Sequence, residues 1–402
     1  MIRGRIEQIE EGCTEHRRSE PTPCYRVRHS GLLEKTFKLI VSEERRSAGL
    51  TVLRLLASWC AVVYGGVVEL RNRLFDLNLL TSHRSDCRVI SVGNLAVGGT
   101  GKTPMVLWLA QFLMDEGWRV AIVSRGYRGQ AGRKVCILSD GQSILAGPEE
   151  TGDEPQLLAR RLPEVPVLCC ARRVSAVRAA VKLFRCQVAI LDDGFQHRFL
   201  ARDLDVVLLD SRSPLGNGRL FPRGVLRERV GSLARAQILV LSRFDGSRRA
   251  QENRRALSRK WPGKPIFTAR HRPLRLFEAS TGREQPASVL AKLRLAAFAG
   301  IGQPEDFFRA LDDLGGRLVY ASALPDHHAL TSELLGRLVR EASRYKPQLW
   351  VTTEKDWIRL PETIPEDMDL WVLVVELELD LGNGESAFKQ LVRGSVSPET
   401  GC

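Results

Sequence analysis

A glycine-rich segment at residues 91–104 (SVGNLAVGGTGKTP) carries the residue types best suited to chemistry in this chain. Its glycines allow tight turns in which backbone N–H groups point at phosphate oxygens, and the helix expected to begin at Lys102 adds a favourable dipole. We expect the Lys102 ammonium to reach the β- and γ-phosphates of ATP and the Thr103 hydroxyl to bind Mg²⁺. The predicted phosphate-binding residues are Gly98, Gly99, Thr100, Gly101, Lys102 and Thr103.

The loop departs at one position from the common pattern G-x-x-x-x-G-K-[ST], because Ala96 stands where the first glycine is expected. Gly98 and Gly99 offer backbone flexibility in its place. A GTPase would carry [NT]-K-x-D to read guanine, and in residues 353–356 (TEKD) the lysine comes one place too late. The loop also resembles that of membrane-cycling partition ATPases, but those carry a Lys just before the first of the two adjacent glycines, where this chain has Val97. The difference from the partition ATPases and the difference from GTPases both favour a small-molecule kinase.

Two groups of carboxylates accompany this loop. Asp192 and Asp193 end the apolar run QVAILDD, and the carboxyl end of such a strand lies beside a phosphate loop, so we expect one of them to hold Mg²⁺ directly or through water. Asp153 and Glu154 open another expected helix, where acids also favour the helix dipole. Because phosphoryl transfer to an alcohol needs a proton acceptor, Asp153 is a candidate base, and His327 is a candidate relay or tuning group.

The elements that must position these residues follow an α/β pattern. From Cys87 onward, short apolar runs alternate with helical stretches, which predicts a P-loop NTPase-type, mostly parallel sheet with helices on both faces. We place a P-loop kinase domain at 48–285, with an N-terminal helix at about 50–72, and a smaller C-terminal α/β subdomain at 286–402. Residues 1–47 are charged and without periodicity, which favours an extension outside the fold, with disorder as one interpretation.

The strongest apolar stretch covers residues 55–68 (LLASWCAVVYGGVV). It is shorter than the roughly 20 apolar residues of a membrane span. Trp59 and Tyr64 lie within it, and Arg71 and Arg73 follow it, and such aromatics and basic flanks suit a helix that lies in a membrane interface. A buried core helix is the alternative interpretation.

Composition narrows the class of partner. The chain has 402 residues, a formal net charge of +13 and nine cysteines. The basic balance favours an anionic partner, which could be nucleic acid, a phosphorylated substrate or an acidic membrane. The chain has no aromatic-basic module typical of nucleic-acid binding, which disfavours the first of these. The cysteines form no C-x-x-C pair, so neither a zinc site nor a disulfide framework is indicated. The polar residues 1–20 do not read as a signal peptide.

Several motifs occur in an order that resembles the tetraacyldisaccharide 4'-kinase family, from about residue 50 to the C-terminus. In chain order they are VGNLAVGGTGKTP, SRGYRG, GDEP, LDDGFQHR, GNG, AGIGQPEDFF, PDHH and TTEKDWIRL. The resemblance implies transfer of the γ-phosphate of ATP to the 4'-hydroxyl of a lipid A disaccharide 1-phosphate, with Mg²⁺. It also implies a peripheral or monotopic enzyme at the cytoplasmic face of the bacterial inner membrane.

The resemblance also carries residue roles. Asp153 falls on the family's proposed base and His327 on its dyad partner, and we expect the two to meet only when the domains that carry them approach each other. Glu154, together with Asp192 and Asp193, falls on acidic positions near the metal.

Arg125 and Arg172 fall on or near basic positions of the family's cleft. Arg223 and Val225 stand where the family tends to have Ala and Pro, and residues 1–47 have no recognised counterpart. The alternatives are a P-loop kinase for another glycolipid or sugar, and a membrane-bound ATPase switch that works by binding partners.

Overall fold

The computed structural model describes residues 24–27, 32–42, 47–126, 134–326, 328–379 and 383–397. The chain divides into two compact units. The larger unit comprises residues 32–272 and 375–402, and the smaller unit comprises residues 1–31 and 273–374. The chain passes between them within β9 (Ile266–Glu278) and again within β14 (Leu370–Leu379).

The larger unit is built on a sheet with the strand order β9-β8-β7-β2-β6-β3-β5-β4. Its remaining strands are β2 (Arg88–Asn94), β3 (Val120–Ser124), β4 (Cys136–Asp140), β5 (Pro166–Cys169), β6 (Val188–Asp192), β7 (Leu204–Asp210) and β8 (Ile238–Ser242). Neighbouring strands pair in parallel except β4, which is antiparallel to β5. Strands β3, β6 and β8 are buried along their whole length, as expected for parallel strands covered on both faces.

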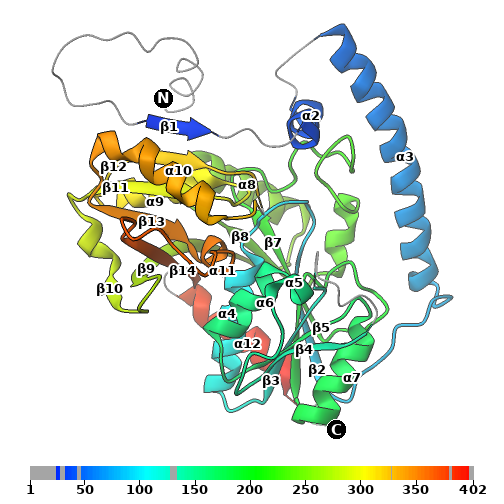
Figure 1. Ribbon diagram of the computed structural model, residues 1–402. Coiled ribbons are helices and arrows are strands. Elements are labelled where there is room, and N and C mark those ends of the chain that lie inside the picture. The colour runs from blue at the N-terminus through cyan, green and yellow to red at the C-terminus, as the bar shows by residue number, and fades with distance from the viewer. Residues whose placement is uncertain are drawn as a thin grey trace. The chain divides into compact units, whose positions relative to one another are not determined.

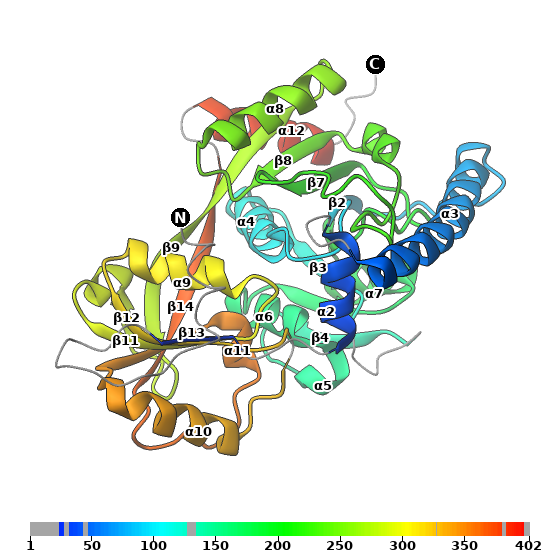
Figure 2. The ribbon, with the colours of Figure 1, turned by 90° about the horizontal axis from the view of Figure 1, so that it is seen from above.

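Helices cover both faces of this sheet (Figures 1 and 2). The helices of the larger unit are α2 (Leu32–Val41), α3 (Ala48–Asp76), α4 (Lys102–Asp115), α5 (Pro148–Thr151), α6 (Asp153–Arg161), α7 (Arg173–Phe184), η1 (Val230–Arg235), α8 (Arg248–Lys260) and α12 (Asn383–Val396). Side chains alternate along β2, so that Ile90 packs in one core cluster with Leu109 of α4, while Val89 packs in another with Val177 of α7. The predicted fold class is confirmed.

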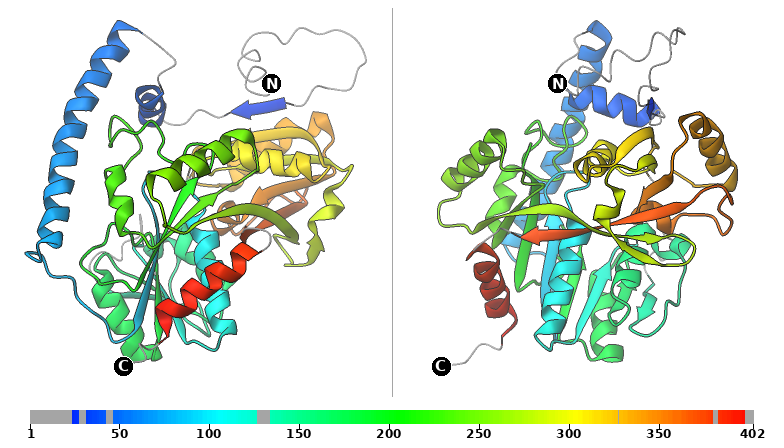
Figure 3. Two further views of the ribbon diagram at one scale, coloured as in Figure 1. Left: turned by 180° about the vertical axis from the view of Figure 1, so that it is seen from behind. Right: turned by 90° about the vertical axis from the view of Figure 1, so that its left-hand side faces the viewer.

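The last helix, α12, belongs to the larger unit. The Phe388 ring packs edge-on against Trp108 of α4 and Phe267 of β9, with centroid distances of 5.3 and 5.2 Å. Figure 3 shows α12 in red beside the cyan α4. The single boundary expected near residue 285 therefore differs from the observed division, because the apolar face of α12 returns the chain to the first core.

The smaller unit has a parallel sheet with the order β1-β12-β11-β13-β14. Its other elements are β1 (Cys24–Val27), β10 (Glu284–Pro286), η2 (Ala287–Leu290), β11 (Arg294–Ala299), α9 (Pro304–Asp313), β12 (Arg317–Ala323), α10 (Ser332–Ala342), η3 (Ser343–Tyr345), β13 (Leu349–Thr353) and α11 (Glu354–Ile358). Asp356 is buried, accepts the Gly300 N–H at 3.1 Å and pairs with Arg359 at 2.6 Å. The TEKD segment thus ends in a structural carboxylate.

Two elements lie inside the predicted N-terminal extension, namely β1 and α2. The last carbonyl groups of α2, which have no partner within a helix, accept hydrogen bonds from side chains of the larger unit. Arg54 donates to Leu39 O at 3.0 Å and also to Ser42 O. Arg223 donates to Ile40 O at 2.9 Å, and Asn217 donates to Val41 O at 3.2 Å. The Arg223 side chain therefore helps to hold α2 in place.

The predicted apolar helix is α3, which has 29 residues and begins at the N-cap Ser47. Within the described residues it is the one helix long and apolar enough to cross a membrane, although only 17% of its apolar window is buried (Figures 1 and 3). Ala57, Ala61 and Gly65 face the protein. The opposite face is exposed and consists of Val52, Leu55, Leu56, Trp59, Val62, Val63, Val67 and Leu70. This exposure is contrary to the interpretation of a buried core helix.

Candidate active site

The glycine-rich loop joins β2 to α4, as predicted. Gly98 has φ +123° and Gly101 has φ +83°, which are conformations that residues with a Cβ rarely adopt. The Asn94 amide, at the end of β2, donates to Gly98 O at 3.2 Å and to Thr100 Oγ1 at 3.1 Å. The Asn94 side chain thus stabilises the loop conformation. Thr103 is buried in the first turn of α4.

The Asp192–Asp193 pair lies beside this loop because β6 pairs in parallel with β2. Val92 is the register partner of Asp192, so the two strands end at the same edge of the sheet. A Cβ on Gly93 would lie only 2.5 Å from the Phe195 Cβ, which shows how closely the turn after β6 approaches β2. Asp193 has φ +55°, a left-handed conformation that Asp tolerates better than most residues.

Asp192 is fully buried, and Ser124 Oγ donates to its Oδ2 at 3.1 Å. Burial, reinforced by the negative charge of Glu154, raises the pKa of Asp192 to about 7. Its Oδ1 has no hydrogen-bond partner among the described residues. A buried, unpartnered carboxylate oxygen beside a phosphate loop fits a hard cation such as Mg²⁺, which prefers oxygen ligands.

Asp193 has the opposite electrostatic environment. Arg227 donates to both of its carboxylate oxygens, at 2.9 and 2.7 Å, and the Lys102 Nζ lies 3.7 Å from Oδ1. Burial alone would raise the pKa of Asp193, but the positive charges of Lys102 and Arg227 outweigh it, and the pKa is lowered. The two adjacent carboxylates therefore differ in character, and Asp193 is the one that stays ionised.

Asp153 and Glu154 occupy the first turn of α6, preceded by Gly152 with φ +87°. Both side chains are half-buried. The negative charge of Glu154 contributes to the raised pKa of Asp192, so the start of α6 lies within electrostatic reach of that carboxyl. The structure thus places both carboxylate groups at the same end of the larger unit.

The remaining predicted residues are placed as follows. Arg125 is exposed directly after β3, and Arg172 is exposed at the N-cap of α7. The neighbouring Arg173 is buried, and its charge is among the influences that lower the pKa of Asp193. His327 lies outside the described residues. Arg173 was not predicted as a site residue, because the sequence does not tell which of two adjacent arginines is buried. That depends on the orientation of α7.

Two further residues near the loop were also missed. A Cβ on Gly101 would lie 2.7 Å from His271 Nε2, so this imidazole of β9 packs on the loop. Arg243, which follows β8, pairs with Asp210 at 2.9 Å, and its Nη2 would lie 3.8 Å from a Cβ on Gly99. Neither residue belongs to a sequence motif. His271 lies within β9 and Arg243 follows β8, and both strands belong to the parallel sheet near the loop.

A strand that enters a glycine loop and then a helix, with an acidic pair at the end of the adjacent parallel strand, defines a P-loop nucleotide-binding protein. Comparison with known proteins specifies the family. Residues 53–396 match the model of the family described as tetraacyldisaccharide-1-P 4'-kinase, LpxK, and the chain belongs to that family.

Among curated relatives, the chain is 45% identical to the tetraacyldisaccharide 4'-kinase of Syntrophus aciditrophicus, over 76% of this chain and 84% of the relative. It is 42% identical to that of Anaeromyxobacter dehalogenans strain 2CP-C, over 80% and 85%. A crystal structure of the "apo" form of LpxK from Aquifex aeolicus in complex with ATP matches with a TM-score of 0.65 and 31% identity. It covers 84% of this chain and 97% of that chain. The resemblance seen in the sequence is thereby confirmed.

The raised pKa of Asp192 leads to a prediction about stability. The folded-state pKa of about 7 lies above the ordinary value of 3.8, so ionisation of this carboxyl destabilises the fold progressively as the pH rises between about 4 and 7. Asp192→Asn removes the ionisation and retains an acceptor for Ser124. Without Mg²⁺ and nucleotide, we expect its Tm to exceed that of the wild type by several degrees at pH 8, and by little near pH 4.

Thermal unfolding followed between pH 4 and 9 checks this. Asp115→Asn, at an exposed position of α4, is the matched control and should show no such pH-dependent gain. A Tm difference for Asp192→Asn that does not vary with pH would contradict the assignment of a destabilising buried carboxylate.

Proposed function

We propose that this protein is an ATP-dependent kinase that transfers the γ-phosphate to the 4'-hydroxyl of tetraacyldisaccharide 1-phosphate, the lipid A precursor. The observation that carries the proposal is the juxtaposition of the glycine loop, Lys102 and the Asp192–Asp193 pair in a chain that matches this family over most of its length. The relative of known structure binds ATP, and we extend that ligand to this loop.

Backbone N–H groups of residues 98–101 and the Lys102 ammonium bind and orient the phosphates in this proposal. Thr103, Glu154, Asp192 and Asp193 are the residues that would hold Mg²⁺. The ion, when bound, neutralises charge on the β- and γ-phosphates. Among the described residues, no group of three His, Cys, Asp or Glu side chains lies close enough together to hold a metal ion.

We assign Asp153 as the general base that accepts the proton of the sugar hydroxyl. It stands at the start of α6, close to the acidic pair, where a carboxylate can face the transferring phosphate. His327 is proposed as its partner, on the strength of the family resemblance. Arg125 and Arg172 are proposed to contact anionic groups of the substrates, and the buried Arg173 adds positive charge beside them.

The direct test uses γ-labelled ATP and the lipid A precursor in detergent or vesicles. The expected result is label on the lipid, at the 4' position, in a Mg²⁺-dependent reaction. Label released only as inorganic phosphate, together with ATP-dependent dimerisation, would favour the membrane-bound ATPase switch instead. Transfer to a different glycolipid or sugar in preference to this precursor would replace the acceptor but keep the kinase.

We further propose that α3 binds the cytoplasmic face of the inner membrane with its exposed apolar face, because burial of apolar surface drives such binding. Replacement of Leu55, Leu56 and Val63 by Glu is expected to move most of the protein from the membrane fraction to the soluble fraction. These side chains are 54–65% exposed, so the change spares the core.

Fractionation of cell lysates checks this prediction. The matched control carries Glu at Leu145, Leu183 and Leu391, which are also exposed apolar positions but lie outside α3. The control should remain with the membrane. Equal loss of membrane binding in both variants would point to a general effect of added negative charge.

A further inference from the structure

Residues 225–228 form a short segment that is hydrogen-bonded to the beginning of the phosphate loop. Val97 N donates to Val225 O at 2.7 Å, and Arg227 N donates to Leu95 O at 2.8 Å. These bonds make an antiparallel bridge between Ala96 and Leu226. The conformation of the loop entrance is therefore tied to the position of this segment.

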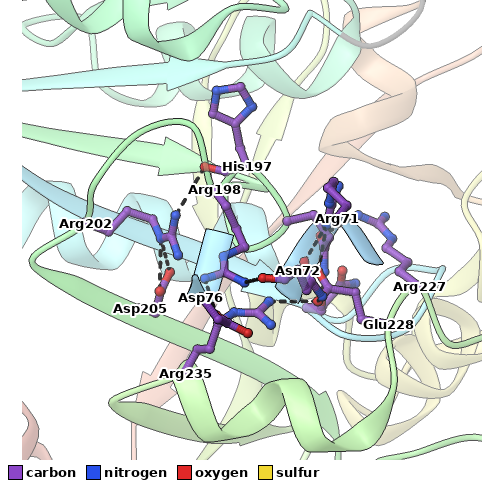
Figure 4. A network of polar contacts seen from close by, with 12 residues as sticks. Arg71, Asn72, Asp76, His197, Arg198, Arg202, Asp205, Arg227, Glu228 and Arg235 are labelled. Carbon is purple, nitrogen blue, oxygen red and sulfur yellow. Dashed lines mark hydrogen bonds and ion pairs between the residues drawn. The ribbon is translucent and has the colours of Figure 1, made fainter. Parts of the chain in front are cut away.

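The same segment is held by α3. Tyr64 Oη donates to Arg227 O at 2.8 Å, and Asn72 Nδ2 donates to Glu228 Oε2, also at 2.8 Å. The Glu228 side chain is 1% exposed, and it also pairs with Arg235 at 2.8 Å and Arg71 at 3.7 Å (Figure 4). A buried carboxylate needs such partners, so its position depends on the residues that α3 supplies.

A second set of contacts joins α3 to the turn that follows the acidic pair. Arg198 donates to Asn72 O at 2.9 Å and to Asp76 at 2.6 Å (Figure 4). Its guanidinium lies over the Phe75 ring, 5.0 Å from the ring centroid. In the same turn Gln196 donates to Asn94 O at 3.0 Å, at the base of the loop. The end of α3 thus contacts both segments that carry site residues.

Arg227 links these contacts to the chemistry. Its backbone carbonyl is fixed by Tyr64, while its side chain donates to both oxygens of Asp193, which in turn lies 3.7 Å from Lys102. A displacement of this one residue would move Asp193 relative to the loop. Displacements of about 1 Å at such sites cost on the order of 100-fold in rate.

We propose that α3 is a positioning element of the active site as well as the membrane-facing helix. Tyr64 and Asn72 hold residues 227–228 in the place from which Arg227 sets Asp193 beside Lys102. The expected effect of these contacts on kcat rests on the proposed kinase function. Their expected effect on Mg²⁺-dependent nucleotide binding follows from the geometry of the P-loop site alone.

The test uses Tyr64→Phe in the full-length protein, since it removes a single hydroxyl. Ser58→Ala is the matched control, because Ser58 Oγ is also a hydroxyl of α3 but donates within the helix, to Arg54 O at 2.8 Å. For Tyr64→Phe we expect kcat to fall by about tenfold and the Mg²⁺ concentration for half-maximal binding of a fluorescent ATP analogue to rise several-fold. Co-sedimentation with phosphatidylethanolamine–phosphatidylglycerol vesicles should stay unchanged, and Ser58→Ala should match the wild type in all three measurements.

A double-variant cycle with Arg227→Ala separates positioning from a general loss of stability. If Tyr64 acts through Arg227, Tyr64→Phe costs nothing further once Arg227 is removed. Asn72→Ala removes the amide that donates to Glu228 and should show the same dependence with a larger loss. Independent, multiplicative losses, or equal losses in Ser58→Ala, would overturn the proposal. If the wild-type protein fails to phosphorylate the lipid, the kinase assignment is wrong. The Mg²⁺-dependent binding of the ATP analogue then still tests whether α3 positions Asp193.

Discussion

Lys102→Ala is expected to lower kcat for lipid phosphorylation by about 10²–10³-fold, the range found when a preorganised charge stabiliser is removed from a reaction centre. The Lys102 side chain is 11% exposed at the start of α4 and lies 3.7 Å from Asp193. When ATP binds, the Lys102 ammonium can therefore leave Asp193 and contact the transferring phosphates instead. Because Arg227 still pairs with Asp193, the variant should remain folded.

Steady-state kinetics with saturating ATP and lipid measure this effect. Lys182→Ala, at an exposed position of α7, is the control for loss of one positive charge and should retain full activity. Lys102→Arg should recover little, because the planar guanidinium does not reproduce a compact ammonium in a tight loop. Wild-type kcat in a folded Lys102→Ala protein would exclude this loop as the active site.

Asp153→Asn is expected to reduce kcat by about 10²–10⁴-fold with little change in ATP affinity, because a general base contributes that much to proton transfer. The substitution keeps the size of the side chain and the start of α6. Glu154→Gln is the matched neighbour, and we expect it to act mainly on the Mg²⁺ concentration that activity requires, since its charge influences Asp192.

The proposed partnership with His327 is tested by a double variant. His327→Ala should lower kcat more mildly, and Asp153→Asn with His327→Ala should lose less than the product of the two single effects, because residues that act as a unit are not additive. Multiplicative losses would show that the two work separately. An unchanged kcat in Asp153→Asn would remove it as the base and leave Glu154 as the next candidate.

The parts of the site that follow local chain rules were predictable. The glycine spacing before Lys102 predicts a loop between a strand and a helix. The parallel β-α pattern then places Asp192 and Asp193 at the edge of the sheet where this loop also lies. These inferences need only neighbours in sequence and the direction of parallel strands.

The remaining parts depend on contacts between distant segments. Arg227 reaches Asp193 from a segment without helical or strand periodicity, and His271 reaches Gly101 from strand β9. The return of α12 to the larger unit has the same cause, because its apolar face does not specify which core it joins. No periodicity in a single sequence encodes such pairings, so they appear only in the folded chain.

The way in which α2 is attached has a consequence for truncation of the chain. Arg223 is 7% exposed and donates to Ile40 O. Removal of α2 would take that acceptor away from a buried guanidinium, and a buried charge that loses a partner is costly. We therefore expect a protein that begins after α2 to be less stable than the full chain, even though none of the proposed site residues belongs to α2.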